Sequence, residues 1–303
     1  MLKRSSRPFF AFVVLGLVAA GCQQSSDGTA REQAPEAGEE KPSEEKSAAA
    51  TSFGSSRPEQ LTGGHDNATS ASIEVAAEAI QPHMAIGSDD RIHLAFIHRG
   101  NISVSTSQDR GKTFSDPIVA IDVQGRARGG AQRGPRIGVD KNGNITVTAP
   151  VTFDDAEYKK QYPTADLFLV RSIDGGKSWS KPRQVNEVTK QAPEALHWMT
   201  VSSDGKAHVA WLDRRDRDQQ PGQDIYYATV VDGKVGANVK VATTVCECCA
   251  PGLAVDASGD PFVVFREGGS KPSREIFARW STNGGRSFAE AIQINSQKTL
   301  EVG

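Results

Sequence analysis

Three cysteines near the C-terminal end of the chain are the residues best suited to chemistry: Cys246, Cys248 and Cys249. Thiolates are soft ligands that favour Cu(I) or Zn, so this group could hold a copper or zinc ion. The alternative is a disulfide from Cys246 to Cys248 or Cys249, which leaves one thiol unpaired. Side-chain alternation along a strand predicts Cys246 and Cys248 on one face and Cys249 on the other. The sequence therefore supports a metal site, a redox site or a disulfide.

Five arginines form a second group that could bind a ligand: Arg99, Arg136, Arg214, Arg215 and Arg266. A planar guanidinium binds a carboxylate through two parallel hydrogen bonds, so arginines that converge would capture an acidic ligand. The alternative is that the loop arginines Arg99, Arg214 and Arg215 are simply solvated. The elements that carry these residues decide between the two.

The body of the chain alternates short apolar strands with turns rich in Gly, Asp and Asn, which is typical of all-β folds. Four similar units are visible, and in each an innermost strand ends in a turn, at residues 87–90, 140–143, 202–205 and 256–259. Second strands are predicted at 92–97, 145–151, 207–212 and 261–265, and third strands at 102–106, 167–171, 225–229 and 276–280. Four units of four antiparallel strands predict a β-propeller. Closure has two alternatives: a small ring of four blades with residues 73–80 as a closing strand, or a truncated relative of a longer propeller whose open edges pair with another copy, and we favour the second.

An eight-residue pattern recurs at the end of the third predicted strand, at residues 107–114, 172–179 and 281–288. Its acidic or amide residue (Asp109, Asp174, Asn283) can accept hydrogen bonds from the following backbone. Its glycine (Gly111, Gly176, Gly285) supplies a positive φ, and its aromatic residue (Phe114, Trp179, Phe288) packs under the turn. A degenerate copy occurs at residues 232–233. The pattern predicts a tight hairpin in each unit.

This pattern, Ser-x-Asp-x-Gly-x-Thr-Trp, resembles the Asp-box, or BNR repeat, of bacterial sialidases and related β-propellers. The resemblance implies a propeller of four-stranded antiparallel blades, and the four visible repeats are fewer than the six blades of sialidases. Asp-boxes are folding elements that lie away from the site. We therefore expect function at the opposite rim.

Aligning the innermost strands on their last residues places several reactive side chains on that rim. The aligned ends are Ile86, Val139, Val201 and Val255. The alignment makes His83, Arg136, Trp198 and Gly252 equivalent, with His197 just before Trp198. Imidazoles also bind copper and zinc, so His83 and His197 are candidate ligands beside the three thiols.

The resemblance to sialidases also implies roles for single residues. Arg136, Arg215 and Arg266 would bind the sugar carboxylate, Tyr158 or Tyr162 would be the nucleophile, and Asp154 or Asp155 would be the acid. A tyrosine nucleophile is a recognised exception among glycosidases. The Phe/Tyr-Arg-Ile-Pro motif of the first sialidase blade is missing, and residues 135–137 echo it only in part. The predicted function is carbohydrate-directed, by glycan binding or exo-sialidase-type hydrolysis; the alternative is a soft-metal or redox scaffold.

The N-terminal part of the chain predicts an extracytoplasmic lipoprotein. Residues 1–21 combine basic residues, an apolar run and small residues, as in a signal peptide, and Cys22 follows as the predicted lipidation site. Residues 22–57 are acidic and rich in Ser and Ala, which predicts a disordered tether, and residues 58–303 form the propeller domain. The net charge of -2 argues against a nucleic-acid-binding surface. We expect attachment to the cell envelope, at the outer membrane or the periplasmic or extracellular face, through the lipid.

Overall fold

The computed structural model describes residues 72–130, 132–153, 164–217, 222–268 and 275–295. They belong to the compact unit that begins at Ala68. The predicted signal peptide, the predicted lipidation site Cys22 and the predicted tether lie outside the described residues. The described residues form strands and turns without a helix, so they include no helix long and apolar enough to span a membrane.

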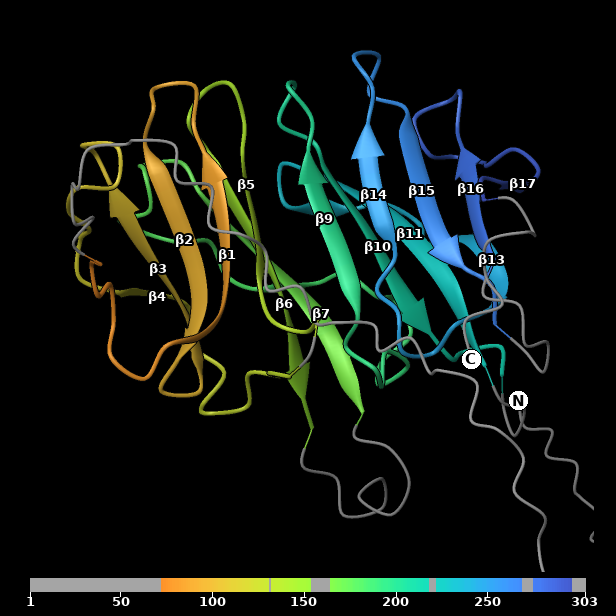
Figure 1. The fold of residues 1–303 in the computed structure, drawn as a ribbon, viewed down its shortest axis with the longest axis horizontal. Coiled ribbons are helices and arrows are strands. Elements are labelled where there is room, and N and C mark those ends of the chain that lie inside the picture. Colours follow the sequence, from red (N-terminus) through yellow and green to blue (C-terminus); the bar gives the residue numbers. More distant parts are fainter. Residues whose placement is uncertain (1–71, 131, 154–163, 218–221, 269–274, 296–303) are drawn as a thin grey trace, which may run out of the picture. The chain divides into compact units, whose positions relative to one another are not determined.

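The strands form four antiparallel sheets that follow one another in sequence order (Figure 1). The first sheet contains β1 (Ile80–Ile86), β2 (Ile92–His98), β3 (Asn101–Ser107) and β4 (Ile118–Ile121). The second contains β5 (Arg136–Val139), β6 (Ile145–Thr152), β7 (Ala165–Ser172) and β8 (Arg183–Gln184). The third contains β9 (His197–Val201), β10 (Ala207–Asp213), β11 (Gln223–Val231), β12 (Lys234–Val235) and β13 (Val239–Val245). The fourth contains β14 (Gly252–Val255), β15 (Pro261–Arg266), β16 (Ile276–Trp280) and β17 (Ile292–Gln293).

These sheets are the blades of a β-propeller, as the sequence predicts. The innermost strands β1, β5, β9 and β14 contact one another in that order. The third blade departs from four strands because β12 and β13 both pair with β11, at different places along it. Its outer strand is therefore broken into two pieces. The alternative of a closing strand at residues 73–80 is wrong, because β1 begins at Ile80 and the described residues before it include no strand.

The register of the innermost strands confirms the alignment made from the sequence. The last residue of each pairs with the first residue of the second strand, in the pairs Ile86 with Ile92, Val139 with Ile145, Val201 with Ala207 and Val255 with Pro261. His83, Arg136, Trp198 and Gly252 therefore occupy equivalent positions in the four blades.

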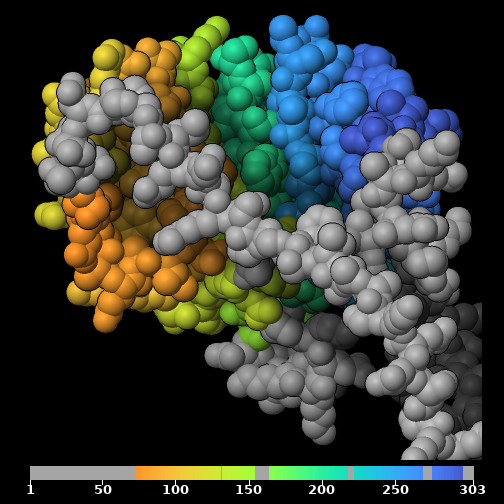
Figure 2. Space-filling model, viewed as in Figure 1, coloured from red at the N-terminus to blue at the C-terminus, as the bar shows by residue number. Residues whose placement is uncertain are grey.

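Three apolar cores hold consecutive blades together. The first and second blades share a core that includes Ile102 and Val147. Leu169 and Trp211 belong to the core between the second and third blades, and the third and fourth blades share the last core. Burying one large apolar side chain contributes roughly 1.5 to 3 kcal/mol, so these faces dominate the stability of the stack. In the space-filling view, the atoms of consecutive blades adjoin (Figure 2).

The recurring eight-residue pattern folds in the same way in all three copies. The glycine N–H donates to the serine Oγ, at 2.7 Å in Gly111, 2.8 Å in Gly176 and 2.9 Å in Gly285. These glycines have φ of 87°, 89° and 86°. Hydrogen bonds from Thr113 and Ser178 are the largest cause that lowers the pKa of Asp109 and Asp174, respectively, to about 2. Phe114, Trp179 and Phe288 are half-buried, and Asn283 takes the place of aspartate in the third copy.

Candidate functional site

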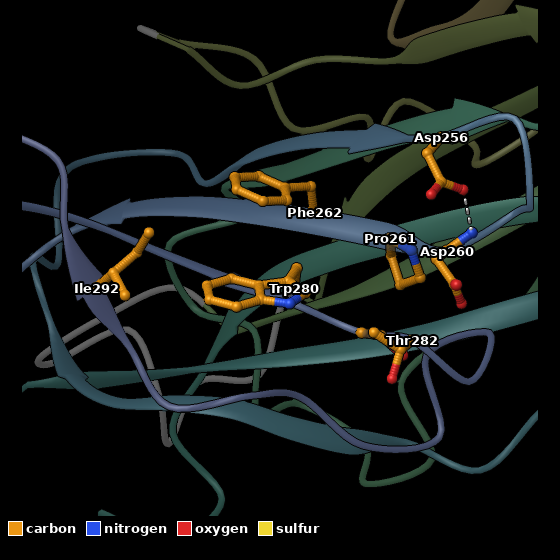
Figure 3. Close-up of a pocket in the computed structure, with 8 residues that line it drawn as sticks. Asp256, Asp260, Pro261, Phe262, Trp280, Thr282 and Ile292 are labelled. Carbon is orange, nitrogen blue, oxygen red and sulfur yellow. Dashed lines mark hydrogen bonds between the residues drawn. The ribbon is translucent and has the colours of Figure 1, made fainter.

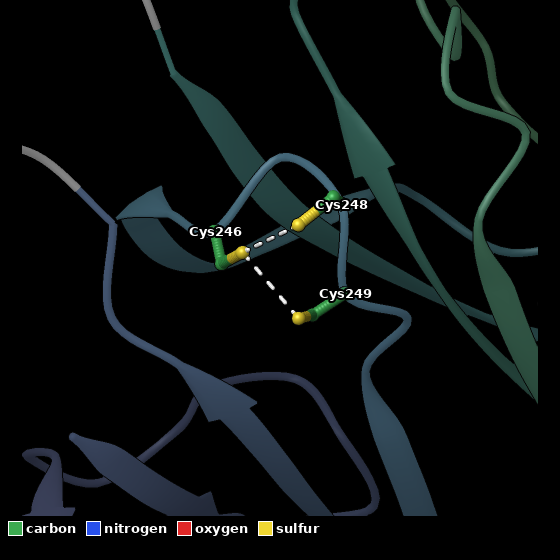
Figure 4. Close-up of side chains that lie close together, drawn as sticks. All are labelled: Cys246, Cys248 and Cys249. Carbon is green, nitrogen blue, oxygen red and sulfur yellow. Dashed lines mark hydrogen bonds between the residues drawn. The ribbon is translucent and has the colours of Figure 1, made fainter. Parts of the chain in front are cut away.

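The three thiols converge in the turn that connects β13 with β14. The Sγ atom of Cys246 lies 3.4 Å from those of both Cys248 and Cys249 (Figure 4). All three sulfur atoms lie within 4.8 Å of one another, and none of the three cysteines is in a disulfide. The predicted split between two faces of a strand is wrong, because β13 ends at Val245 and the cysteines follow in a turn.

Backbone contacts hold this turn in place. Val245 forms a β-bridge with Glu267, and the Cys246 N–H donates to the Arg266 carbonyl at 2.9 Å. At the other end, the Ala250 N–H donates to Gln132 Oε1 at 3.1 Å. Hydrogen bonds therefore join the thiol-bearing turn both to the end of β15 in the fourth blade and to Gln132 in the segment before β5.

Arg266 ends β15 beside the sulfur atoms. Its Nη2 lies 2.6 Å from Cys246 Sγ and 3.8 Å from Cys248 Sγ. Burial alone would raise the pKa of Cys246, but hydrogen bonds with Cys248 and Cys249 and the nearby guanidinium outweigh it and lower this pKa. Burial, followed by the hydrogen bond to Cys246, raises the pKa of Cys249 to about 12. Of Cys246 and Cys249, Cys246 is therefore the one whose thiolate form these contacts stabilise, next to the positive charge of Arg266.

A second cluster occupies the equivalent positions of the first three blades. His83 and Trp198 make an edge-to-face ring contact, with centroids 5.9 Å apart. The guanidinium carbon of Arg136 lies 5.0 Å from the centroid of Trp198. His83 Nδ1 accepts from the Ile137 N–H at 3.2 Å. Burial first, and the charge of Arg136 second, lower the pKa of His83 to about 4, so this imidazole is neutral at pH 7.

Arg136 itself is a buried cation that pairs with no acid among the described residues. Only 8% of its surface is exposed. Its Nη1 donates to the Pro135 carbonyl at 3.0 Å and its Nη2 to the Gln132 carbonyl at 2.9 Å, while Nε has no partner within the described part of the chain. Burial lowers the pKa of Arg136. The positive charge is thus offset by neutral carbonyl groups and by the face of Trp198.

Gln132 places the two clusters on one rim. Its backbone carbonyl accepts from Arg136, and its side-chain oxygen accepts from Ala250, the residue after Cys249.

The predicted ligands His83 and His197 lie with Arg136 and not among the sulfur atoms. Within the described residues, only the three cysteines form a group with metal-ligand spacing. His197 is fully buried, with Nε2 3.1 Å from Thr148 Oγ1.

Arg215 has partners of its own in the third blade. Its Nε and Nη2 donate to the two carboxylate oxygens of Asp213, at 3.0 and 2.7 Å. Its guanidinium carbon stacks 4.0 Å from the centroid of Tyr226, and Nη1 contacts Glu187 at 3.2 Å. The carboxylate-binding capacity of Arg215 is therefore used within the chain. The three predicted arginines have separate partners: carbonyls for Arg136, Asp213 for Arg215 and Cys246 for Arg266.

The predicted nucleophile and the predicted acid belong to a segment outside the described residues. Tyr158, Tyr162, Asp154 and Asp155 lie outside the described residues. Sequence reasoning missed Gln132 and the contact between Arg266 and the thiols. No local pattern marks either one, because both contacts join segments that are distant along the chain.

A pocket of about 470 Å³ lies on the fourth blade, apart from the predicted residues. Phe262 and Trp280 stack on its wall with centroids 6.1 Å apart (Figure 3). Asp256 lies at one end, where a carboxylate oxygen accepts from the Asp260 N–H at 2.9 Å. The carboxylates of both aspartates accept turn hydrogen bonds, so this pocket presents mainly an aromatic surface.

No protein-family model matches the chain, and no curated protein sequence matches it significantly. Among solved structures it is similar to a protein of unknown function from Dyadobacter fermentans DSM 18053, with a TM-score of 0.49 and 17% identity, over 72% of this chain and 70% of that chain. A PL25 ulvan lyase has a TM-score of 0.48 and 14% identity, over 72% of this chain and 56% of that chain. The intramolecular trans-sialidase from Ruminococcus gnavus has a TM-score of 0.46 and 12% identity, over 73% and 71%. The chain thus spans less than two thirds of the ulvan lyase, and likenesses this weak assign it no activity.

Proposed function

We propose that this protein is a carbohydrate-directed propeller, lipid-anchored to the cell envelope through Cys22, that binds acidic glycans at Arg136. The three hairpins would then be Asp-boxes of a sialidase-like propeller. The single observation that carries the proposal is the buried guanidinium of Arg136, which pairs with no carboxylate among the described residues.

The cost of burying a charge explains why this arginine points to an anionic ligand. An isolated ion is expensive to bury unless it is paired, and arginine pairs best with carboxylates. Arg215 shows the usual solution within this chain, because Asp213 contacts it through both oxygens. Among the residues that the structure describes, Arg136 has only carbonyl acceptors and its Nε has no partner. A carboxylate brought by a ligand would supply the missing charge.

The neighbours of Arg136 fit a sugar acid better than a bare anion. Trp198 holds the guanidinium from one side and His83 presents a neutral ring beside it. Aromatic and neutral polar groups of this kind contact the apolar faces and hydroxyl groups of sugars. Binding is the core of the proposal, and hydrolysis would need Tyr158 or Tyr162 with Asp154 or Asp155 to complete the site.

A glycan array probed with the full chain tests the proposal. We expect signal on glycans that end in sialic or uronic acids and none on their neutral counterparts. Arg136→Gln should abolish the signal, whereas the exposed Arg183→Gln, which removes the same charge from β8, should keep it. Equal binding by the two variants, or no binding of any acidic glycan by the folded wild type, would refute the proposal. Release of free sialic acid from a bound glycan would extend it from binding to hydrolysis.

A further inference from the structure

We propose that Cys246, Cys248 and Cys249 form a three-coordinate Cu(I) site, separate from the glycan site. The proposal rests on the geometry of one short turn, in which the three sulfur atoms lie within 4.8 Å of one another. Thiolates bind a soft metal at roughly 2.3 Å, so three sulfurs around one ion are separated by roughly 4 Å. The spacing in the turn is thus close to that of a metal-bound trio.

The surroundings of the sulfurs favour three-coordination over four. Structural zinc sites are almost always tetrahedral and need a fourth ligand. Within the described residues no histidine or carboxylate joins the three cysteines. Arg266 lies against Cys246 and Cys248, and a guanidinium has no lone pair to give to a metal. Cu(I) is selected by soft thiolates and does not require the fourth ligand that this turn lacks.

The turn is prearranged and open on one side, which suits reversible metal binding. Hydrogen bonds to Arg266 and Gln132 fix its two ends. Cys246 is buried, Cys249 is half-buried and Cys248 is exposed. An ion could therefore reach the group from the side of Cys248 and leave by the same route. This arrangement fits a protein that takes up and passes on Cu(I) better than one that uses a metal for folding.

The test is an anaerobic titration of the reduced full chain with Cu(I) in competition with a chromophoric Cu(I) chelator. We expect one Cu(I) per chain, with X-ray absorption showing three sulfur neighbours. Cys248→Ser changes an exposed side chain, so the variant should fold normally. It should weaken Cu(I) binding by more than about 100-fold. The reason is that losing even a residue that hydrogen-bonds to a metal ligand typically lowers metal affinity 10- to 100-fold. Cys22→Ser is the matched control and should bind like the wild type.

Four results would overturn the inference. The first is equal Cu(I) binding by the wild type and the Cys246→Ser/Cys248→Ser/Cys249→Ser variant. The second is a reduced protein that prefers zinc in direct competition. The third is a disulfide among the three cysteines that persists in the folded protein under reducing conditions. The fourth is normal affinity in the folded Cys248→Ser variant. Glycan binding by Cys248→Ser should be unchanged, so failure of this inference is distinguishable from failure of the proposed glycan site.

Discussion

Mild acid should destabilise the protein through two histidines that are fully buried. His197 and His208 are both 0% exposed. Burial first, then the charge of Arg136, lowers the pKa of His197 to about 3. Burial first, then the charge of Lys206, lowers the pKa of His208 to about 4. Both imidazoles are therefore neutral in the folded protein at pH 5, whereas in the unfolded chain their pKa returns to about 6.5.

The size of the effect follows from proton binding. Below pH 6.5 the unfolded chain binds more protons than the folded one, so the free energy of unfolding falls as the pH falls. Each pH unit costs up to about 1.4 kcal/mol per histidine, so the step from pH 7 to pH 5 costs about 2 kcal/mol for each and about 4 kcal/mol for the pair. This stability is present above about pH 7 and is lost toward the folded pKa values. Asp109 and Asp174 stay ionised throughout, because their pKa is about 2.

Denaturant unfolding at pH 7 and pH 5 measures this loss. His197→Gln and His208→Gln should each reduce the pH-dependent loss by about 2 kcal/mol, because each removes one titrating group. The half-buried His98→Gln serves as the matched control. The reasoning fails if His197→Gln loses as much stability between the two pH values as the wild type does. His83 has a similarly lowered pKa but is partly exposed, so solvent screening makes its share smaller.

Three further changes test the packing. Gly285→Ala should lower the denaturation midpoint more than Gly284→Ala. Both glycines have positive φ, but only a Cβ at Gly285 overlaps the Tyr227 ring. Equal shifts of the midpoint in the two variants would contradict this contact. Asp213→Ala should cost about 3 to 5 kcal/mol of unfolding free energy, because it strips the buried Arg215 of its carboxylate, and a loss below about 1 kcal/mol would show that the pair is not needed. Ser172→Ala should cost about 1 to 3 kcal/mol in the same assay, because the Gly176 N–H then loses its acceptor, while the exposed Ser180→Ala should cost less.

The blades could be predicted from the sequence because their signals are local. Strand alternation and the recurring turn fix the ends of the innermost strands, and the register agrees at Ile86, Val139, Val201 and Val255. The broken outer strand of the third blade was missed, because the two-residue turn at 232–233 looks like the other hairpins. The difference arises after β12, where β13 pairs at another place along β11.

The candidate sites could be predicted only in part. The cysteines and Arg136 stand out by residue type, and the alignment brings them to one rim. The contacts of these residues could not be predicted. Arg266 at the end of β15 contacts Cys246 in the turn before β14. Arg215 pairs with Asp213, a contact that depends on the direction of both side chains. Cys249 lies on the same side as Cys246 because both residues are in a turn, where side chains do not alternate as they do along a strand.

Gln132 changes how this stack of repeats should fold. Most contacts in a repeat protein join neighbouring units, so stability can spread one unit at a time. Gln132 precedes the second blade, yet it accepts from Ala250, 118 positions away, at the start of the fourth blade. The third blade must be in place before this bond can form, because β9 contacts both β5 and β14. The thiol-bearing turn should therefore order late and cooperatively, and slow hydrogen exchange at the Ala250 amide, lost in Gln132→Ala, would report it.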